Sequence, residues 1–318
     1  MNRRGILAGL ATAPFIRPAR AETWPVRPVR IVAPFPPGGT VDILARLTAG
    51  WLQEAIGQTF IVENRSGAGG NIGAAAVARA APDGYTLLLG SPGTQAINAH
   101  LYPDPGYDGI ADFAPISLVA EVPNLLAVHP SLNIQTVPAL IAAAKARSLA
   151  YGETSIGGST HLSAELFRLQ AGIEGVHVSY RGSSPMLADL LPGRIAWGVD
   201  NLPSILPHIR SGALVAVGVT SKSRWSGAPE IPAIAESLPG YEVTAWFGLL
   251  APKGTPGEPI GTANAALRRM LATPAAMQRL GELGATPIAG TPEAYRDHIA
   301  AEYRKWGDVI RRAGIKLE

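Results

Sequence analysis

The 318-residue sequence contains no cysteine, and only 16% of its residues are charged. The absence of cysteine excludes disulfide bonds, thiol nucleophiles, iron–sulfur ligation and cysteine zinc sites, so burial and packing must stabilise the fold. The six histidines are scattered, and no two have the helical spacing of paired zinc ligands. We therefore expect neither a metal nor any other cofactor.

Nucleotide-binding and nucleophile motifs are also missing. The Gly-rich turn at residues 66–73 has Ile72 where a dinucleotide fingerprint needs its last glycine, and no Gly-Lys-Ser/Thr forms a P-loop. Ser159 and His161 lie close in sequence but outside a Gly-x-Ser-x-Gly elbow. We expect no enzyme, and a hydrolase using Ser159 and His161 is the less favoured alternative.

The first 21 residues have the pattern of an export signal. Residues 1–4 are positively charged, residues 5–16 are apolar, and Ala19-Arg20-Ala21 has the small-x-small form of a signal-peptidase site. The apolar run is shorter than the ~20 residues that span a bilayer. We expect cleavage after about Ala21 and a periplasmic protein. The paired Arg3-Arg4 fits the twin-arginine route as well as the general one.

This leader accounts for the basic balance of the chain. Four of the 27 Lys and Arg residues lie in the leader, which has no acid, whereas all 24 Asp and Glu residues follow it. Removing 21 of 318 residues leaves 297, with 23 cations against 24 acids and a formal charge of −1. The charge therefore gives no indication of nucleic-acid or membrane-surface binding, and the length suits two domains.

From about Pro28 the sequence alternates β-rich runs with helical patterns, which predicts an α/β fold with mostly parallel strands. Thr40 is the expected N-cap of a helix from Val41 to about Ile56, and Gly57 its C-terminal stop. Strands are expected at 29–33, 59–63, 85–89, 149–151, 176–180, 195–199 and 214–219, and further helices up to 81 and at 136–147, 161–171 and 185–191.

Three helical stretches are predicted near the C-terminus. Two open with Thr-Pro, at Thr273 and Thr291, which suits an N-cap followed by the first helical residue. The last stretch places Ile299, Tyr303, Trp306 and Ile310 on one stripe, so it should pack on a domain.

The segment from Ala33 to Asp42 is the strongest candidate binding feature. It places Gly38 and Gly39 before a helix N-terminus at the carboxyl end of a strand, the edge where open α/β folds bind ligands. Free N–H groups and the helix dipole favour an anion there, and glycine lets it approach the backbone. A tight turn without a ligand is the alternative. For Asp42, the residues alone favour a role at the helix dipole over a ligand contact.

Six segments carry a family pattern in one order along the chain: residues 34–42, 62–73, 82–88, 93–98, 161–162 and 200–204. Together they resemble the tripartite tricarboxylate transporter receptor family, also called Bug proteins. The resemblance implies a periplasmic-binding-protein (Venus-flytrap) fold, in which two α/β domains are joined by two crossing strands. It implies domain 1 at 22–120 plus 248–318 and domain 2 at 121–247.

The same resemblance implies a function. A monomeric receptor would close on a small carboxylate, which is a di- or tricarboxylate, an amino acid or an aromatic acid, without chemistry on it. It would deliver this solute to the membrane permease subunits of a tripartite transporter. A sensor that binds the solute for a signalling partner is an alternative.

The resemblance also implies the residues of the cleft. They are Phe35, Pro37, Gly39, Thr40, Asp42, Ser91 and Thr94 on the first wall, Ser159, Thr160, His161, Arg181, Gly182 and Asp200 on the second, and Trp246 and Phe247 as a cap. Arg181 would make a bidentate anion contact or, alternatively, be an exposed surface arginine. Glu153, Ile156, Arg181 and Val199 depart from the family pattern in the second wall. The identity of the carboxylate is therefore left open.

Overall fold

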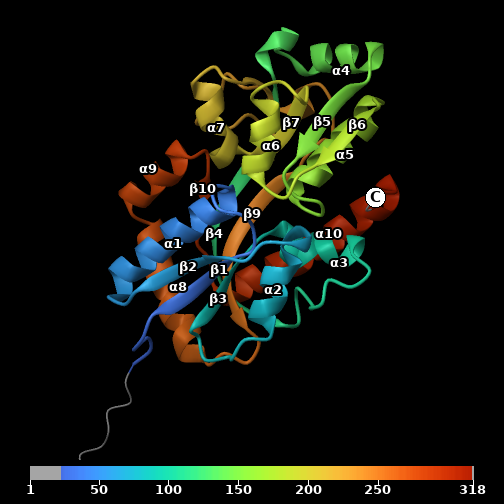
Figure 1. The fold of residues 1–318 in the computed structure, drawn as a ribbon. Helices are drawn as coiled ribbons and strands as arrows, with labels where there is room; N and C mark the ends of the chain where they lie inside the picture. The colour runs from blue at the N-terminus through green and yellow to red at the C-terminus, as the bar shows by residue number, and fades with distance from the viewer. Residues whose placement is uncertain (1–22, 317–318) are drawn as a thin grey trace, which may run out of the picture.

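The computed structural model describes residues 23–316 and has two lobes, one above the other in Figure 1. The middle of the chain, green to yellow, forms the upper lobe, whereas the N-terminal and C-terminal parts share the lower lobe. The leader predicted at 1–21 lies outside the described residues. In the described part of the chain, no helix is long and apolar enough to cross a membrane.

The strands of both lobes are linked through two long ones, β4 (Phe113–Val128) and β9 (Thr244–Pro252). The order is β2-β1-β3-β9-β4-β7-β5-β6, and β8 and β10 also pair with β4. The remaining bounds are β1 Val29–Ala33, β2 Phe60–Asn64, β3 Thr86–Gly90, β5 Leu149–Glu153, β6 Gly175–Ser179, β7 Trp197–Asn201, β8 Val215–Val219 and β10 Thr286–Pro287.

The pairing explains how β4 serves both lobes. Its residues 113–123 lie antiparallel to β9, and residues 124–128 pair with β7 and β8. Parallel pairs flank this region: β1 with β2 and β3 below, and β5 with β6 and β7 above. Ala120 pairs with Phe247, so the two positions near which crossings are predicted are partners in the sheet. The division into domains at these positions stays a prediction.

Ten α-helices cover the sheet within residues 23–316. They are α1 Thr40–Ile56, α2 Asn71–Ala78, α3 Asn98–Leu101, α4 Val137–Ala146, α5 Ser159–Ala171, α6 Ser183–Leu190, α7 Leu202–Arg210, α8 Gly257–Leu271, α9 Pro274–Glu282 and α10 Pro292–Ala313. The predicted caps at Thr273 and Thr291 are confirmed, since their side chains accept hydrogen bonds from Ala276 N and Ala294 N. The predicted cap at Thr40 is wrong.

The N-cap of α1 is Gly39. Thr40 is the first residue of the helix, and its hydroxyl lies 2.7 Å from Ser204 Oγ in the upper lobe. This contact with a distant residue takes the place of a cap on its own helix.

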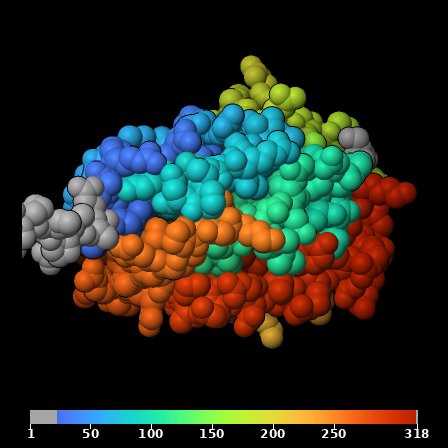
Figure 2. All heavy atoms as spheres, turned by 90° about the horizontal axis from the view of Figure 1, so that it is seen from below, coloured from blue at the N-terminus to red at the C-terminus, as the bar shows by residue number. Residues whose placement is uncertain are grey.

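The two ends of the chain build the lower lobe together. Helix α1 packs on α8, and α10 packs on β4 and on the π-helical turn Gly93–Ile97. Seen from below, the blue to cyan N-terminal part and the orange to red C-terminal part lie side by side on one face (Figure 2). The stripe predicted for α10 is confirmed, because Ile299, Trp306 and Ile310 are buried and Tyr303 packs against the same core.

Candidate functional site

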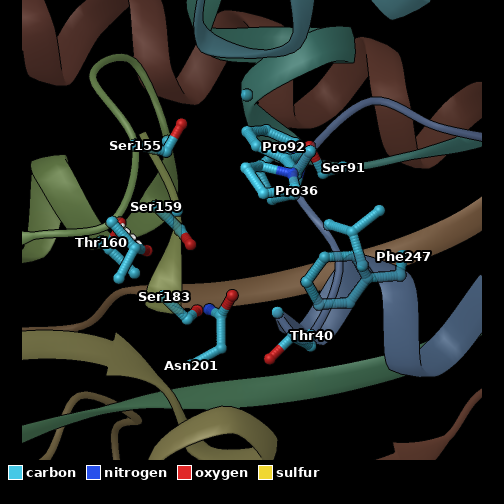
Figure 3. A pocket seen from close by; sticks show the side chains of 17 residues that line it. Pro36, Thr40, Ser91, Pro92, Ser155, Ser159, Thr160, Ser183, Asn201 and Phe247 are labelled. Carbon is cyan, nitrogen blue, oxygen red and sulfur yellow. Dashed lines mark hydrogen bonds between the residues drawn. The ribbon is translucent and has the colours of Figure 1, made fainter. Parts of the chain in front are cut away.

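A cavity lies between the two lobes (Figure 3). Its volume is about 480 Å³, including the space at its open mouth. The lower lobe contributes Phe35, Pro36, Gly39, Thr40, Val41, Ser91, Pro92, Gly93 and Phe247, and the upper lobe contributes Thr154, Ser155, Gly158, Ser159, Thr160, Gly182, Ser183 and Asn201. In Figure 3, Ser155, Ser159 and Thr160 lie opposite Pro36, Ser91 and Pro92.

Four α-helices within the described residues begin at this cavity: α7 has Asn201 as its N-cap, and each of the other three has glycine. Gly39 precedes α1, Gly158 precedes α5 and Gly182 precedes α6. Glycine has no side chain to occupy the first N–H groups of a helix, and these groups have no partner inside the helix itself. The positive ends of three helix dipoles therefore point at one space. The cavity favours an anion through backbone groups alone.

The side chains around the cavity are polar but uncharged. Hydroxyl groups come from both lobes, and none of the described residues that line the cavity is Asp, Glu, Lys, Arg or His. Apolar surface comes from Phe35, Pro36, Val41, Pro92 and Phe247. A small anion with an apolar segment matches this combination of N–H and O–H donors with aromatic walls.

The lobes touch at the margin of the cavity. The Thr40 and Ser204 hydroxyls lie 2.7 Å apart, and Ser184 Oγ donates to Pro37 O at 3.3 Å. On another side, Tyr102 Oη donates to Ile156 O at 3.4 Å. Direct hydrogen bonds between the lobes identify this as a closed arrangement.

Asp42 shapes the turn at residues 35–40 but does not line the cavity. Its carboxylate is buried and accepts hydrogen bonds from Gly38 N, from Arg46 and from Asn64 Nδ2 at 2.9–3.0 Å. Asn64 Nδ2 also donates to Phe35 O, so the same network fixes the start of the turn. The structure thus gives Asp42 a positioning role, in place of the ligand contact that the resemblance implies.

Pro37 is exposed and contributes a carbonyl that bridges the lobes, not a cavity wall. Thr94 is buried beneath Ser91, whose N–H donates to Thr94 Oγ1 at 3.0 Å, and Thr94 Oγ1 donates to Ser91 O at 3.2 Å. Thr94 therefore acts indirectly, because it holds Ser91, which does line the cavity.

Trp246 and Phe247 point to opposite faces of β9, since neighbouring side chains alternate across a strand. Phe247 lines the cavity. Trp246 faces α10, where its Nε1 donates to Glu302 at 3.1 Å and its ring packs edge-on against Tyr295 and His298. Of the two residues predicted to cap the cleft, only Phe247 lies at the cavity.

His161 and Arg181 lie outside the cavity. The ring of His161 stacks on that of His177, with centroids 5.8 Å apart, and its Nδ1 accepts from Gly157 N. Residues two apart on a helix do not share a face, which is why Ser159 lines the cavity and His161 does not. Arg181 is exposed and borders a groove beside the Gly-rich turn 66–72, which adjoins the cavity at Phe35, Pro36, Thr154 and Ser155. Its position fits the alternative of a surface arginine.

Asp200 lies directly behind the cavity wall. Its carboxylate is wholly buried, and its Oδ1 accepts hydrogen bonds from Ser183 Oγ at 3.0 Å and Asn201 N at 2.7 Å. Both of these residues line the cavity. Burial raises the pKa of Asp200, and hydrogen bonds from Ser183, Asn201 N and Thr154 lower it. Burial is the larger effect, and the pKa is about 7.

The family model for the tripartite tricarboxylate transporter family receptor matches residues 44–315. Protein BugT of Bordetella pertussis is 40% identical, with all of both chains covered. The chain belongs to the tripartite tricarboxylate transporter receptor family.

Solved structures similar to this chain agree with the fold. One described as R. palustris Rpa4515 with adipate has a TM-score of 0.90 and 43% identity, covering 92% of this chain and 99% of that one. Another, described as MatC from Rhodopseudomonas palustris with bound malate, has a TM-score of 0.85 and 31% identity, covering 90% and 100%. The predicted periplasmic-binding-protein fold is confirmed.

About half of the residues that line the cavity were not predicted from the sequence. The additional residues are Pro36, Val41, Pro92, Gly93, Thr154, Ser155, Gly158, Ser183 and Asn201. Most of them flank residues that were named, in the turns that follow β1, β3, β5, β6 and β7. One signal could have found Ser183: it opens a helix directly after a glycine, as Thr40 and Ser159 do.

Proposed function

We propose that this receptor binds a small carboxylate solute in the cavity between its lobes. The observation that carries the proposal is the meeting of three glycine-capped helix N-termini at one uncharged, hydroxyl-lined space. Charge-assisted hydrogen bonds from backbone N–H groups are stronger than those between neutral groups. They can replace the hydration of a carboxylate without a cationic side chain.

The proposed solute spans the cavity. One carboxylate meets the first turn of α1 after Gly39, with the Thr40 and Ser91 hydroxyls nearby. The opposite end meets the starts of α5 and α6, where Ser159, Thr160 and Ser183 lie. The rings of Phe35 and Phe247 flank the carbon chain between them. The adipate and malate of the two solved relatives belong to this chemical class.

Capture proceeds by closure of the lobes in this proposal. The strands β4 and β9 connect the lobes and are the proposed hinge. The hydrogen bonds between Thr40 and Ser204 and between Ser184 and Pro37 then hold the closed state.

The exported, monomeric receptor delivers its solute to the permease subunits of a tripartite transporter. In its host, deletion of the gene should abolish uptake of the solute; retained uptake with loss of a solute-dependent transcriptional response would indicate a sensor instead.

A binding screen tests the proposal. Adipate, malate, citrate, aspartate and benzoate are each added to the purified protein, and thermal unfolding is followed. A solute at 100 times its Kd stabilises the folded state by about 2.7 kcal/mol, so a true ligand gives a clear rise in Tm. Adipamide is the matched control, because it keeps the length of adipate and lacks the charge. Binding of adipamide as strong as that of adipate, or no response to any carboxylate, would overturn the proposal.

A further inference from the structure

A buried, ionisable carboxylate sits one hydrogen bond away from the cavity. Asp200 is the penultimate residue of β7 and has none of its surface exposed, and Ser183 Oγ donates to its Oδ1 at 3.0 Å. No described residue makes a hydrogen bond of normal geometry to the second oxygen, Oδ2, and beyond Ser183 and Asn201 N only the nearby Thr154 hydroxyl favours the charged form. A buried oxygen without a partner is costly when the carboxylate is charged, and the cost falls when this oxygen carries a proton.

Ser183 lies between Asp200 and the anion-binding turn. It lines the cavity, and a Cβ built on Gly39 would lie 3.4 Å from its Oγ. A serine hydroxyl carries one proton and two lone pairs. While that proton is donated to an ionised Asp200, the hydroxyl presents only lone pairs to the cavity, and these repel a carboxylate. Once Asp200 is protonated it can itself donate, which leaves the Ser183 proton for the solute.

We propose that a carboxylate solute binds together with one proton, which Asp200 holds, so that the Ser183 hydroxyl is free to donate its own hydrogen bond to the solute. Asp200 is thus a positioning residue: it sets whether Ser183 donates into the cavity or accepts from it. The inference rests on the proposed function, because it concerns the same cavity. The proton comes from solvent on binding and returns to solvent on release.

Burial is the dominant influence on Asp200, and it raises the pKa to about 7. The elements packed around β7 carry other titratable and charged groups: Glu121 on β4, Glu153 on β5, His161, Glu165 and Arg168 on α5, Asp189 on α6, and His208 and Arg210 on α7. None of these groups contributes to that shift. The Glu153 carboxylate is engaged by Ser179 and Ser155. Asp42 across the cavity is paired with Arg46.

The pH dependence follows from linkage. A solute anion beside Ser183 raises the pKa of Asp200 further, since a like charge disfavours the ionised form. The affinity is then constant below the pKa of the free protein. Above about pH 7 it falls roughly tenfold per pH unit, until the pKa of the complex is reached.

Calorimetric titration with adipate from pH 6 to pH 9 tests this inference. At pH 8, repeating the titration in phosphate and in Tris, whose heats of ionisation differ, gives the number of protons taken up. We expect Kd to rise above pH 7 and proton uptake to approach one.

Asp200→Asn mimics the neutral carboxyl, so it should bind adipate without proton uptake. Its Kd should be independent of pH and, at pH 8, lower than that of the wild type. Glu165→Gln is the matched control, a carboxylate of the same lobe outside the cavity, and should keep the wild-type slope.

The outcomes separate this inference from the proposed function. Adipate binding with a flat pH profile and no proton uptake would overturn the inference and leave the function standing. A slope that persisted in Asp200→Asn would also overturn it. If no carboxylate bound at any pH, the proposed function itself would fail. Should Asp200→Asn not fold, the proton uptake of the wild type and its loss in Ser183→Ala decide the question.

Discussion

Gly39 offers the most direct test of the anion-binding turn. Its backbone, with φ −84° and ψ 170°, is an extended conformation open to any residue. Gly39→Ala is therefore not strained by its conformation. The new Cβ would lie 3.4 Å from Ser183 Oγ and 3.9 Å from Pro36 O, which is contact without overlap. The methyl group occupies the approach to the first N–H groups of α1, and a carboxylate must reach these groups.

The size of the effect follows from the hydrogen bonds lost. A hydrogen bond to a charged group contributes about 1.5–3 kcal/mol, and 1.4 kcal/mol is a factor of ten in Kd. Displacing the carboxylate from one N–H group should therefore raise the Kd for adipate about 10- to 150-fold. The fold should persist, because replacing glycine at an N-cap costs only about 1 kcal/mol, or a few degrees in Tm.

Gly50→Ala is the control, since it makes the same change in the same helix. A Cβ on Gly50 meets nothing within 4 Å. This variant should gain about 1 kcal/mol of stability from helix propensity and bind adipate with an unchanged Kd. Calorimetry gives Kd, and thermal unfolding without ligand gives stability. Wild-type affinity in Gly39→Ala would refute binding at the start of α1.

Three further variants test residues that the structure places outside the cavity. Asp42→Ala should lower the free energy of unfolding by about 1–3 kcal/mol in urea at pH 7, because Gly38 N, Arg46 and Asn64 lose their acceptor. Burial alone would raise the pKa of Asp42, but hydrogen bonds from these three groups bring it below its usual value. The stabilisation is therefore present above about pH 4 and is lost as the pH falls below it. A stability difference from the wild type that persisted at pH 2 would contradict this account. Trp246→Phe should lower stability by about 1 kcal/mol through loss of the Glu302 hydrogen bond and leave the adipate Kd unchanged, whereas a raised Kd would place the indole in the site. Arg181→Ala should change Kd less than about twofold, and a loss of tenfold or more would restore the bidentate contact.

The alternation of strands and helices could be predicted because each element has its own local pattern. The strand Val29–Ala33 and the helix that ends at Ile56 have the predicted bounds to within a residue. Helix α7 was not predicted, because Pro203 and Pro207 interrupt its pattern, although its apolar face is buried through Leu202, Ile205 and Leu206. The long strand β4 was located only as a crossing implied by the resemblance, because burial along almost all of its 16 residues hides any alternation.

The sequence by itself determined the family, the α/β class and the glycine turn that ends at Gly39 before a helix. These depend on local spacing: a strand, glycines, and a helix start that leaves backbone N–H groups free. Only the tertiary structure decided which side chains reach the cavity. Trp246 and Phe247 are neighbours in sequence, yet the pleat of β9 sends one to α10 and the other to the site. Likewise, only the packing of α6 on β7 placed the Ser183 hydroxyl between Asp200 and the cavity, and no spacing in the chain could show that contact.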